Sequence, residues 1–256
     1  MKKLVQDFKV VKNTRLNPRH FILVLSAPQP LPEILPGQFV QALVHNSPAT
    51  FLRRPFSVHS VDYIHHTLSL LVQIKGEGTY HMGMLKEGER LNLVYPLGNS
   101  FSIPSAPDIL LIGGGCGVAP LMFLGEYMNG KNIRPDFLVG FRTASEVAEI
   151  EEYSRLGNVY LITEDGSMGE KGLVTEHSLL RKETLPYSRI YCCGPDAMMK
   201  AVAKLSGMHG IRCEVSLENT MACGFGVCLC CITPTDKGNE RVCVEGPVFN
   251  TKRLRW

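Results

Sequence analysis

The chain has 256 residues, of which 45% are hydrophobic and 20% are charged, and its formal net charge is +3. This composition is that of a globular protein with a sizeable core, and so small a net charge argues against binding to nucleic acid or to a membrane surface. The basic start MKKLVQDFKVV lacks the apolar segment of a signal peptide, and the longest uncharged stretch is broken by glycines and by Pro120. We therefore expect a cytoplasmic protein without a leader or a membrane span.

Residues 1–101 contain short apolar runs separated by turn residues. The runs are HFILVLSAP, GQFVQALVH, PFSVHSV, LSLLVQI and RLNLVYP, and none of them shows a helical period. Short strands at such regular spacing predict an antiparallel β-barrel domain.

Two motifs within this region suggest a phosphate-containing ligand. LRRPFSVHS combines a cation, a rigid proline, an aromatic ring and a hydroxyl in Arg54, Pro55, Phe56 and Ser57. The second motif, QIKGEGTY, is a glycine loop that ends at Thr79. An arginine can pair with a phosphate, and the backbone N–H groups around Gly76 and Gly78 can face it. On this basis alone, Phe56 fits the core as well as it fits a cofactor contact.

From residue 102 to residue 214 the pattern becomes strand, turn and helix, repeated. DILLIGGGCGVAPLMFLGEYMNG, RPDFLVGFRTASEVAEIEEYSRLG, NVYLITEDG and SRIYCCGPDAMMKAVAKLSGMHG follow one another in this segment. Alternating short strands and helices predict a parallel sheet with helices on its faces, that is, an α/β domain.

The turn after the first of these strands carries Gly113, Gly115 and Gly117 before a helix that begins near Pro120. Glycines at this point let the backbone approach a pyrophosphate, and the helix N-terminus favours its negative charge. The spacing is not G-x-G-x-x-G, so a tight turn without a ligand remains an alternative. A second turn, after the last strand, contains Cys193, Gly194 and Pro195, for which a buried thiol followed by a turn is the alternative.

Residues 215–256 form a short segment rich in cysteine and glycine that needs a metal cluster in place of a core of its own. Its MACGFGVCLCC stretch and a later cysteine give the pattern C-x4-C-x2-C followed after eleven residues by a fourth, in Cys223, Cys228, Cys231 and Cys243. This is the ligand spacing of a plant-type [2Fe–2S] cluster. Zinc, whose sites usually contain two closely spaced cysteine pairs, and free thiols are the alternatives. Cys230 lies between ligands and is expected to be a bystander.

The motifs PGQFV, RPFS, KGEGT, PLGN, GGGCGVAPL and CGPDAM, in this order, resemble the ferredoxin–NADP reductase superfamily. Its members combine a flavin-binding barrel with a nicotinamide-binding α/β domain. TEDGSMGEKGLVTE and the cysteine module narrow the resemblance to the electron transfer subunits of class 1B dihydroorotate dehydrogenases. Cys116 and Cys192 are departures, because they add thiols next to the two expected nicotinamide motifs.

The resemblance implies a set of cofactor contacts. FAD would contact Arg54, Pro55, Phe56, Ser57, Leu71, Val72, Gln73, Gly78 and Thr79, with Arg54 at the pyrophosphate and Ser57 near the flavin N5. NAD(H) would contact Gly113, Gly115, Gly117, Cys193, Gly194 and Pro195. The [2Fe–2S] cluster would be bound by Cys223, Cys228, Cys231 and Cys243.

The resemblance also implies a function: electrons pass from the FMN of a dihydroorotate dehydrogenase catalytic subunit through the cluster and FAD to NAD⁺, in pyrimidine synthesis. The complex would contain two catalytic and two electron transfer subunits. We expect no catalytic acid–base residue, because no nucleophile–base or carboxylate pair stands out.

Two other functions stay open. One is an NAD(P)H-linked flavin and iron–sulfur oxidoreductase subunit that serves a ferredoxin, a hydrogenase or a glutamate-synthase-like partner. The other is a non-catalytic redox sensor or zinc-binding module. The residues leave NAD against NADP undecided, since Arg142 is followed by Glu146 and Glu149.

Overall fold

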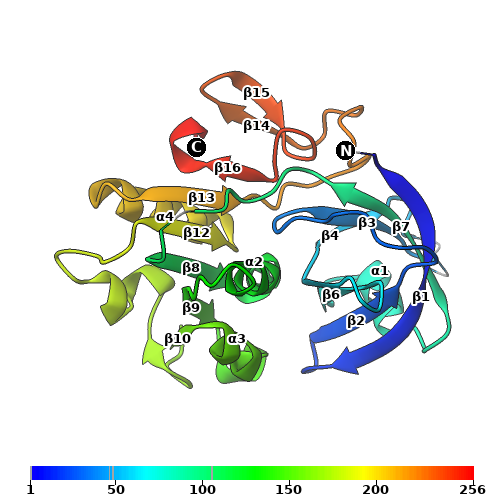
Figure 1. Cartoon of the computed structure of the whole chain (residues 1–256), viewed down its shortest axis with the longest axis horizontal. Coiled ribbons are helices and arrows are strands. Elements are labelled where there is room, and N and C mark those ends of the chain that lie inside the picture. Colours follow the sequence, from blue (N-terminus) through cyan, green and yellow to red (C-terminus); the bar gives the residue numbers. More distant parts are fainter. Residues whose placement is uncertain (1, 46, 48, 105) are drawn as a thin grey trace.

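The computed structural model describes residues 2–45, 47, 49–104 and 106–256. In these residues the strands form two seven-stranded sheets and a two-stranded ribbon. The two sheets lie side by side, and the C-terminal segment lies across both of them (Figure 1). Within the same described residues, no helix is long and apolar enough to cross a membrane.

The first sheet is antiparallel, with the strand order β4-β3-β7-β1-β2-β6-β5. Its strands are β1 (Leu4–Arg15), β2 (His20–Ser26), β3 (Phe39–Leu43), β4 (Arg54–Ser57), β5 (Ser60–Asp62), β6 (Thr67–Gln73) and β7 (Arg90–Leu97). Alternate residues of β2, such as Leu23 and Leu25, are fully buried, as the two-residue period of a strand requires. The predicted antiparallel domain is confirmed. Its sheet curls into a half-barrel that stays open, because no pairing joins the edge strands β4 and β5 among the described residues.

The second sheet has the order β11-β10-β9-β8-β12-β13-β16, and all neighbours are parallel except β13 and β16. Its strands are β8 (Ile109–Gly114), β9 (Asp136–Phe141), β10 (Asn158–Thr163), β11 (Glu170–Lys171), β12 (Arg189–Cys193), β13 (Arg212–Ser216) and β16 (Val248–Asn250). The predicted α/β arrangement is therefore confirmed. The strand order reverses between β8 and β12, and ligands of such sheets bind at the carboxyl ends of the strands beside this point.

Helices connect the strands of both sheets. They are α1 (Glu77–Gly83), which follows β6, and then α2 (Ala119–Asn129), α3 (Ile150–Leu156) and α4 (Asp196–Met208). Single 3-10 turns are η1 (Gly115–Val118), η2 (Ala144–Glu146), η3 (Val174–Glu176), η4 (Ser178–Leu180) and η5 (Thr251–Arg253). Helix α2 is shared between the two halves, because Phe123 belongs to the core of the curled sheet while Leu121 and Leu124 belong to the core of the α/β half.

The C-terminal segment is built into the rest of the molecule. It contains the ribbon β14 (Ile232–Thr235) and β15 (Gly238–Arg241), and β16 then pairs with β13 of the second sheet. Asn99, just after β7, donates to the carbonyls of Glu245 and Val248 at 2.8 and 3.1 Å. The cysteine segment is thus hydrogen-bonded to both halves of the molecule.

Candidate functional site

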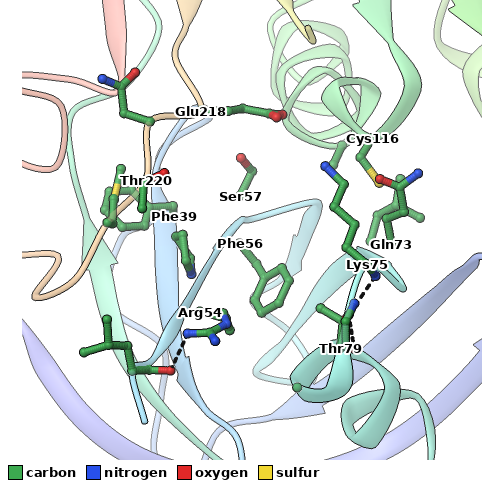
Figure 2. A pocket seen from close by; sticks show the side chains of 18 of the residues that line it. Phe39, Arg54, Phe56, Ser57, Gln73, Lys75, Thr79, Cys116, Glu218 and Thr220 are labelled. Carbon is green, nitrogen blue, oxygen red and sulfur yellow. Dashed lines mark hydrogen bonds between the residues drawn. The ribbon is translucent and has the colours of Figure 1, made fainter. Parts of the chain in front are cut away.

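A cavity of about 760 Å³ lies where strands β4 and β6 meet helix α1, the glycine turn after β8 and the segment that follows β13 (Figure 2). Eight of the residues predicted to contact FAD line it: Arg54, Pro55, Phe56, Ser57, Leu71, Gln73, Gly78 and Thr79. They come from strands β4 and β6 and from the first turn of helix α1. A pocket of this size and mixed character suits a large cofactor with both ring and phosphate groups.

Val72 is the one member of the predicted FAD set whose side chain faces away from the cavity. It is fully buried in the core of the curled sheet. Neighbouring Leu71 and Gln73 line the cavity, since successive side chains of a strand point to opposite faces. A cofactor in this cavity can therefore reach Val72 through its backbone only.

One end of the cavity is suited to phosphate groups. The Arg54 guanidinium donates to the Leu52 carbonyl at 2.8 Å and has no carboxylate partner among the described residues. Thr79 accepts hydrogen bonds from the backbone N–H groups of Lys75 and Gly76 at 2.9 and 3.2 Å, which closes the glycine loop. This arrangement leaves a cation free for a charge-assisted hydrogen bond to an anion.

The other end of the cavity contains two charged residues, Lys75 and Glu218, that were not predicted from the sequence. Figure 2 shows Lys75 and Glu218 projecting toward each other from opposite walls, with Cys116 beside Lys75 and Ser57 below Glu218. The thiol of Cys193 donates to Glu218 Oε1 at 3.9 Å. The Lys75 ammonium, the Glu218 carboxylate and the Cys116 thiol therefore line the end of the cavity that faces the second sheet. The Cys193 thiol is buried and reaches this end only through its hydrogen bond to Glu218.

The carboxyl of Glu218 is reached by water from the cavity, yet the surrounding walls desolvate it. This burial raises its pKa, and the Lys75 ammonium and the Cys193 thiol act in the opposite direction. Burial, followed by the Glu218 charge, raises the pKa of Cys116 to about 12. The only signal for Glu218 in the sequence is its place directly after a strand of the parallel sheet, where ligands of such sheets bind.

The two turns predicted to hold NAD(H) are brought into contact. Cys193 is the register partner of Gly113 on the neighbouring strand. A side chain at Gly117 would collide with the backbone of Cys193 and Gly194, so only glycine allows this approach. Gly115 has φ +53 and faces open space. The turns therefore meet at the carboxyl edge of the sheet, at the point where the strand order reverses.

The four predicted cluster cysteines lie together as two pairs. Each thiol of one pair acts on the pKa of its partner, Cys228 on that of Cys223 and Cys231 on that of Cys243, and the Cys243 N–H donates to the Cys231 thiol at 3.4 Å. In the described part of the chain, no three potential ligands converge as tightly as a single metal ion requires. Cys230 donates instead to the Thr220 carbonyl at 3.5 Å.

The loop around Cys223 has the character of a cluster cradle. Gly224 and Gly226 have φ +79 and +86, which other residues rarely adopt. Burial acts to raise the pKa of the Cys223 thiol, but hydrogen bonds from the backbone N–H groups of Cys228 and Phe225 outweigh it and lower the pKa to about 6. A thiolate among backbone donors, with its partners arranged in pairs, fits a two-iron cluster better than a mononuclear site.

Solved structures of known proteins show the class of fold to which the chain belongs. A solved structure of an NADH-dependent reduced ferredoxin-NADP oxidoreductase, studied for flavin-based electron bifurcation, superimposes with a TM-score of 0.87 at 26% identity, covering 97% of this chain and 90% of that chain. The flavohem-like FAD/NAD-binding domain of nitric oxide dioxygenase from Vibrio cholerae shares the fold, with a TM-score of 0.71 at 19% identity over 82% of this chain and 98% of that chain. The fold is that of the ferredoxin reductases.

Two family models match separate segments of the chain. Residues 111–204 match the oxidoreductase NAD-binding domain, and residues 218–255 match the iron–sulfur cluster binding domain of dihydroorotate dehydrogenase B. The class is therefore a flavin reductase-like oxidoreductase with an iron–sulfur module. The iron–sulfur assignment is confirmed over the zinc alternative.

Curated relatives then give the particular family. The dihydroorotate dehydrogenase B (NAD(+)) electron transfer subunit of Caldanaerobacter subterraneus subsp. tengcongensis is 39% identical over 84% of both chains. The subunit of the same name from Listeria monocytogenes serotype 4a is 35% identical over 98% of this chain and 99% of the relative. The chain belongs to the family of dihydroorotate dehydrogenase B (NAD⁺) electron transfer subunits.

Proposed function

We propose that the chain transfers electrons between the FMN of a dihydroorotate dehydrogenase catalytic subunit and NAD⁺, through a [2Fe–2S] cluster and FAD, in pyrimidine biosynthesis. One observation carries this proposal. The segment Ser216–Met221 forms a wall of the large cavity and continues directly into the loop of Cys223. The proposed flavin and cluster sites are therefore joined by a few residues of one segment, as a short electron path requires.

The residues of each site have separate roles in this proposal. Arg54 and the loop at Gly78 and Thr79 would hold the FAD phosphates, while Phe56 and Leu71 give apolar walls for the ring system. When bound, FAD exchanges hydride with NAD(H) and single electrons with a cluster, a combination that no side chain supplies. Ser57 and Glu218 would face the reacting end of the ring.

The nicotinamide and cluster sites complete the proposal. The turns at Gly113–Gly117 and Cys193–Pro195 would hold NAD(H), and the cysteine pairs would hold one iron each. We assign these roles to segments 102–214 and 215–256, and FAD binding to segment 1–101. Reduced thiols and an iron–sulfur cluster belong to a reducing compartment, so we propose the cytoplasm.

A surface for the partner subunit adjoins the cluster. Exposed apolar side chains gather on and beside the cysteine loop: Phe225, Val227, Leu229 and Ile232 are 40%, 80%, 59% and 43% exposed. Neighbouring exposed apolar residues of this kind are typical of a protein interface. We propose that the catalytic subunit docks here, in a heterotetramer of two catalytic and two electron transfer subunits.

The test is to co-express both subunits and purify them without oxygen. Flavin bands with a broad red shoulder should bleach with NADH, and dihydroorotate should reduce NAD⁺ in the complex only. A protein without flavin colour would defeat the proposal, and reduction of a ferredoxin without any catalytic subunit would favour the alternative partner.

Docking through the cysteine loop can be tested in the same preparation. Val227→Asp should prevent co-purification with the catalytic subunit while the cluster spectrum stays intact, because a charge would be buried at the interface. Ile64→Asp, in a turn of the curled sheet where the side chain is 87% exposed, is the matched control and should co-purify normally.

A further inference from the structure

A buried group of ionisable side chains joins the two halves of the molecule near the large cavity. The side chains of His59 and Glu149 are 4% and 8% exposed, and His59 Nε2 lies 3.0 Å from Glu149 Oε1. Close by, Ser60 donates to Glu126 Oε2 at 2.7 Å. His59 and Ser60 belong to the curled sheet, whereas the two carboxylates belong to the α/β half.

The ring of His59 is held from both sides. Its Nδ1 lies 3.3 Å from the carbonyl oxygen of Ala119, and a carbonyl only accepts, so Nδ1 carries a hydrogen. Its Nε2 approaches a carboxylate oxygen of Glu149, which requires a proton between the two atoms. The pair can hold this proton as imidazolium and carboxylate or as imidazole and carboxylic acid. Both forms make the same two hydrogen bonds, so the ring has one orientation.

The contacts of His59 lead to both proposed cofactor sites. Ser57, two residues before it, lines the cavity proposed for FAD, and so does Ala119. Ala119 also begins helix α2, directly after the glycine turn proposed for NAD(H). The hydroxyl of Tyr153, on helix α3, donates to the Val118 carbonyl at 2.9 Å and supports the same turn from the other side.

Both the backbone and the side chain of Glu149 are in energetically unfavourable environments. It has φ +60 without being glycine, and its second carboxylate oxygen is buried with no hydrogen-bond partner among the described residues. A left-handed backbone and an orphaned buried oxygen both oppose folding. A glycine at position 149 would adopt the left-handed backbone without strain and would have no buried carboxylate oxygen. The carboxylate therefore has a use that outweighs both, and the atom it contacts is His59 Nε2.

We propose that His59 and Glu149 are positioning residues that set the distance between nicotinamide and flavin. The pair ties the end of the flavin-site strand to the first residue after the nicotinamide turn. Hydride transfer needs the reacting atoms at about 3 to 3.5 Å, and a displacement of about 1 Å costs about a hundredfold in rate. The inference rests on the proposed function, since it needs both cofactors to bind where we place them.

The test is stopped-flow reduction of the FAD-loaded, cluster-loaded protein by NADH without oxygen. It yields the limiting rate of flavin reduction, the Kd for NADH and the long-wavelength absorbance of the nicotinamide–flavin complex. His59→Phe keeps the ring volume without the hydrogen bonds, and Glu149→Met removes only the carboxylate. Each should lower the limiting rate at least about tenfold and weaken that absorbance, with the Kd for NADH and the bound FAD unchanged.

Two further variants sharpen the comparison. Glu149→Gln should retain the wild-type rate, because its amide can donate to Nε2 while Nδ1–H still donates to Ala119. His65→Phe is the matched control, a histidine paired with Asp62 at 2.6 Å on the surface, whose side chain is 75% exposed. It should behave as wild type.

The stopped-flow results distinguish a failure of the proposed electron transfer function from a failure of the positioning role of His59 and Glu149. Wild-type flavin that NADH does not reduce would defeat the proposed function itself. Wild-type rates in both His59→Phe and Glu149→Met would overturn the positioning role, and so would a slower rate that only follows loss of FAD or of NADH affinity. If His59→Phe does not fold, Glu149→Met and Glu149→Gln decide the question between them.

Discussion

Arg54 shows how a single residue can define one end of the proposed FAD site. Its neighbour Arg53 is used for structure, since Arg53 donates to the Gln41 and Asn92 carbonyls at 3.2 and 3.1 Å. Arg54 lines the cavity, and within the described part of the chain its side chain donates hydrogen bonds to backbone carbonyls only. Two adjacent arginines thus have opposite roles, and the direction of each side chain from the strand separates them.

Arg54→Ala should weaken FAD binding about ten- to a hundredfold, because a hydrogen bond to a charged group contributes about 1.5 to 3 kcal/mol. The Kd is measured by the quenching of FAD fluorescence as the apoprotein is titrated. Arg90→Ala, an exposed arginine at the start of β7, is the control and should bind FAD normally. Equal affinity in both variants would remove Arg54 from the site.

The raised pKa of Glu218 makes the stability of the folded protein depend on pH. Its pKa is raised in the folded protein, chiefly by burial, so the folded state holds the proton more tightly than the unfolded state does. The stability from this group is fully present below the ordinary carboxyl pKa and is lost as the pH rises through the raised value.

Glu218→Gln cannot titrate, so its melting temperature should fall less than that of wild type as the pH rises from about 4 to 8. Differential scanning calorimetry across this range measures the difference. Glu87→Gln, at an exposed position in the turn before β7, should follow the wild-type curve. Parallel curves for wild type and Glu218→Gln would show that Glu218 does not titrate in this window.

At the scale of elements, the meeting of β8 and β12 decides where a ligand can bind. The glycine turn after β8 packs on the cysteine turn after β12, and the two strands are hydrogen-bonded neighbours although 74 residues, 115–188, separate them in the chain. Their carboxyl ends open on the same side of the sheet. The two turns approach so closely that Gly117 has no room for a side chain.

Gly117→Ala should therefore displace the turn, weakening NADH binding at least about tenfold and lowering the free energy of unfolding by about 1 to 3 kcal/mol. FAD should stay bound, because its proposed contacts lie on other elements. Titration with NADH and urea denaturation test both effects. Gly207→Ala, where an added methyl group in α4 meets no atom within 4 Å, should be neutral or slightly stabilising.

At the scale of the whole molecule, the cysteine segment is part of the fold. Cys231 and Cys243 are buried in the same core cluster as β8, β12 and β13, and β16 completes the second sheet. The segment also carries the residues from Ser216 to Met221 that wall the cavity. Loss of the cluster should therefore disturb the wall of the proposed flavin site and weaken FAD binding.

Cys231→Ser should abolish the red shoulder of the spectrum, lower the melting temperature and increase the loss of FAD on gel filtration. Cys230→Ser should change none of these, because its thiol is exposed and donates to the Thr220 carbonyl. The reverse result, a lost cluster in Cys230→Ser and an intact one in Cys231→Ser, would mean that the two cysteines exchange roles as ligands.

Features carried by a few consecutive residues could be predicted from the sequence. The cysteine spacing, the RPFS and KGEGT motifs and the glycine turn each place their chemical groups by local geometry. Strand period and strand–helix alternation likewise predicted an antiparallel barrel followed by a parallel sheet. The open edge between β4 and β5 and the return of β16 to the second sheet depend on contacts between distant segments, which no local pattern records.

The remaining parts of the site were decided by tertiary structure alone. His59 meets Glu149 ninety residues further along the chain, and Glu218 meets Cys193 across a strand end. In the sequence these residues belong to no recognisable motif and cannot be distinguished from other polar and charged residues. The cysteine spacing predicted the cluster, and the order of the motifs predicted FAD and NAD(H) through the family resemblance, because a motif contains its own candidate ligands. Packing of the two sheets determined which further side chains surround the proposed cofactor sites, because such contacts exist only once distant strands and helices meet.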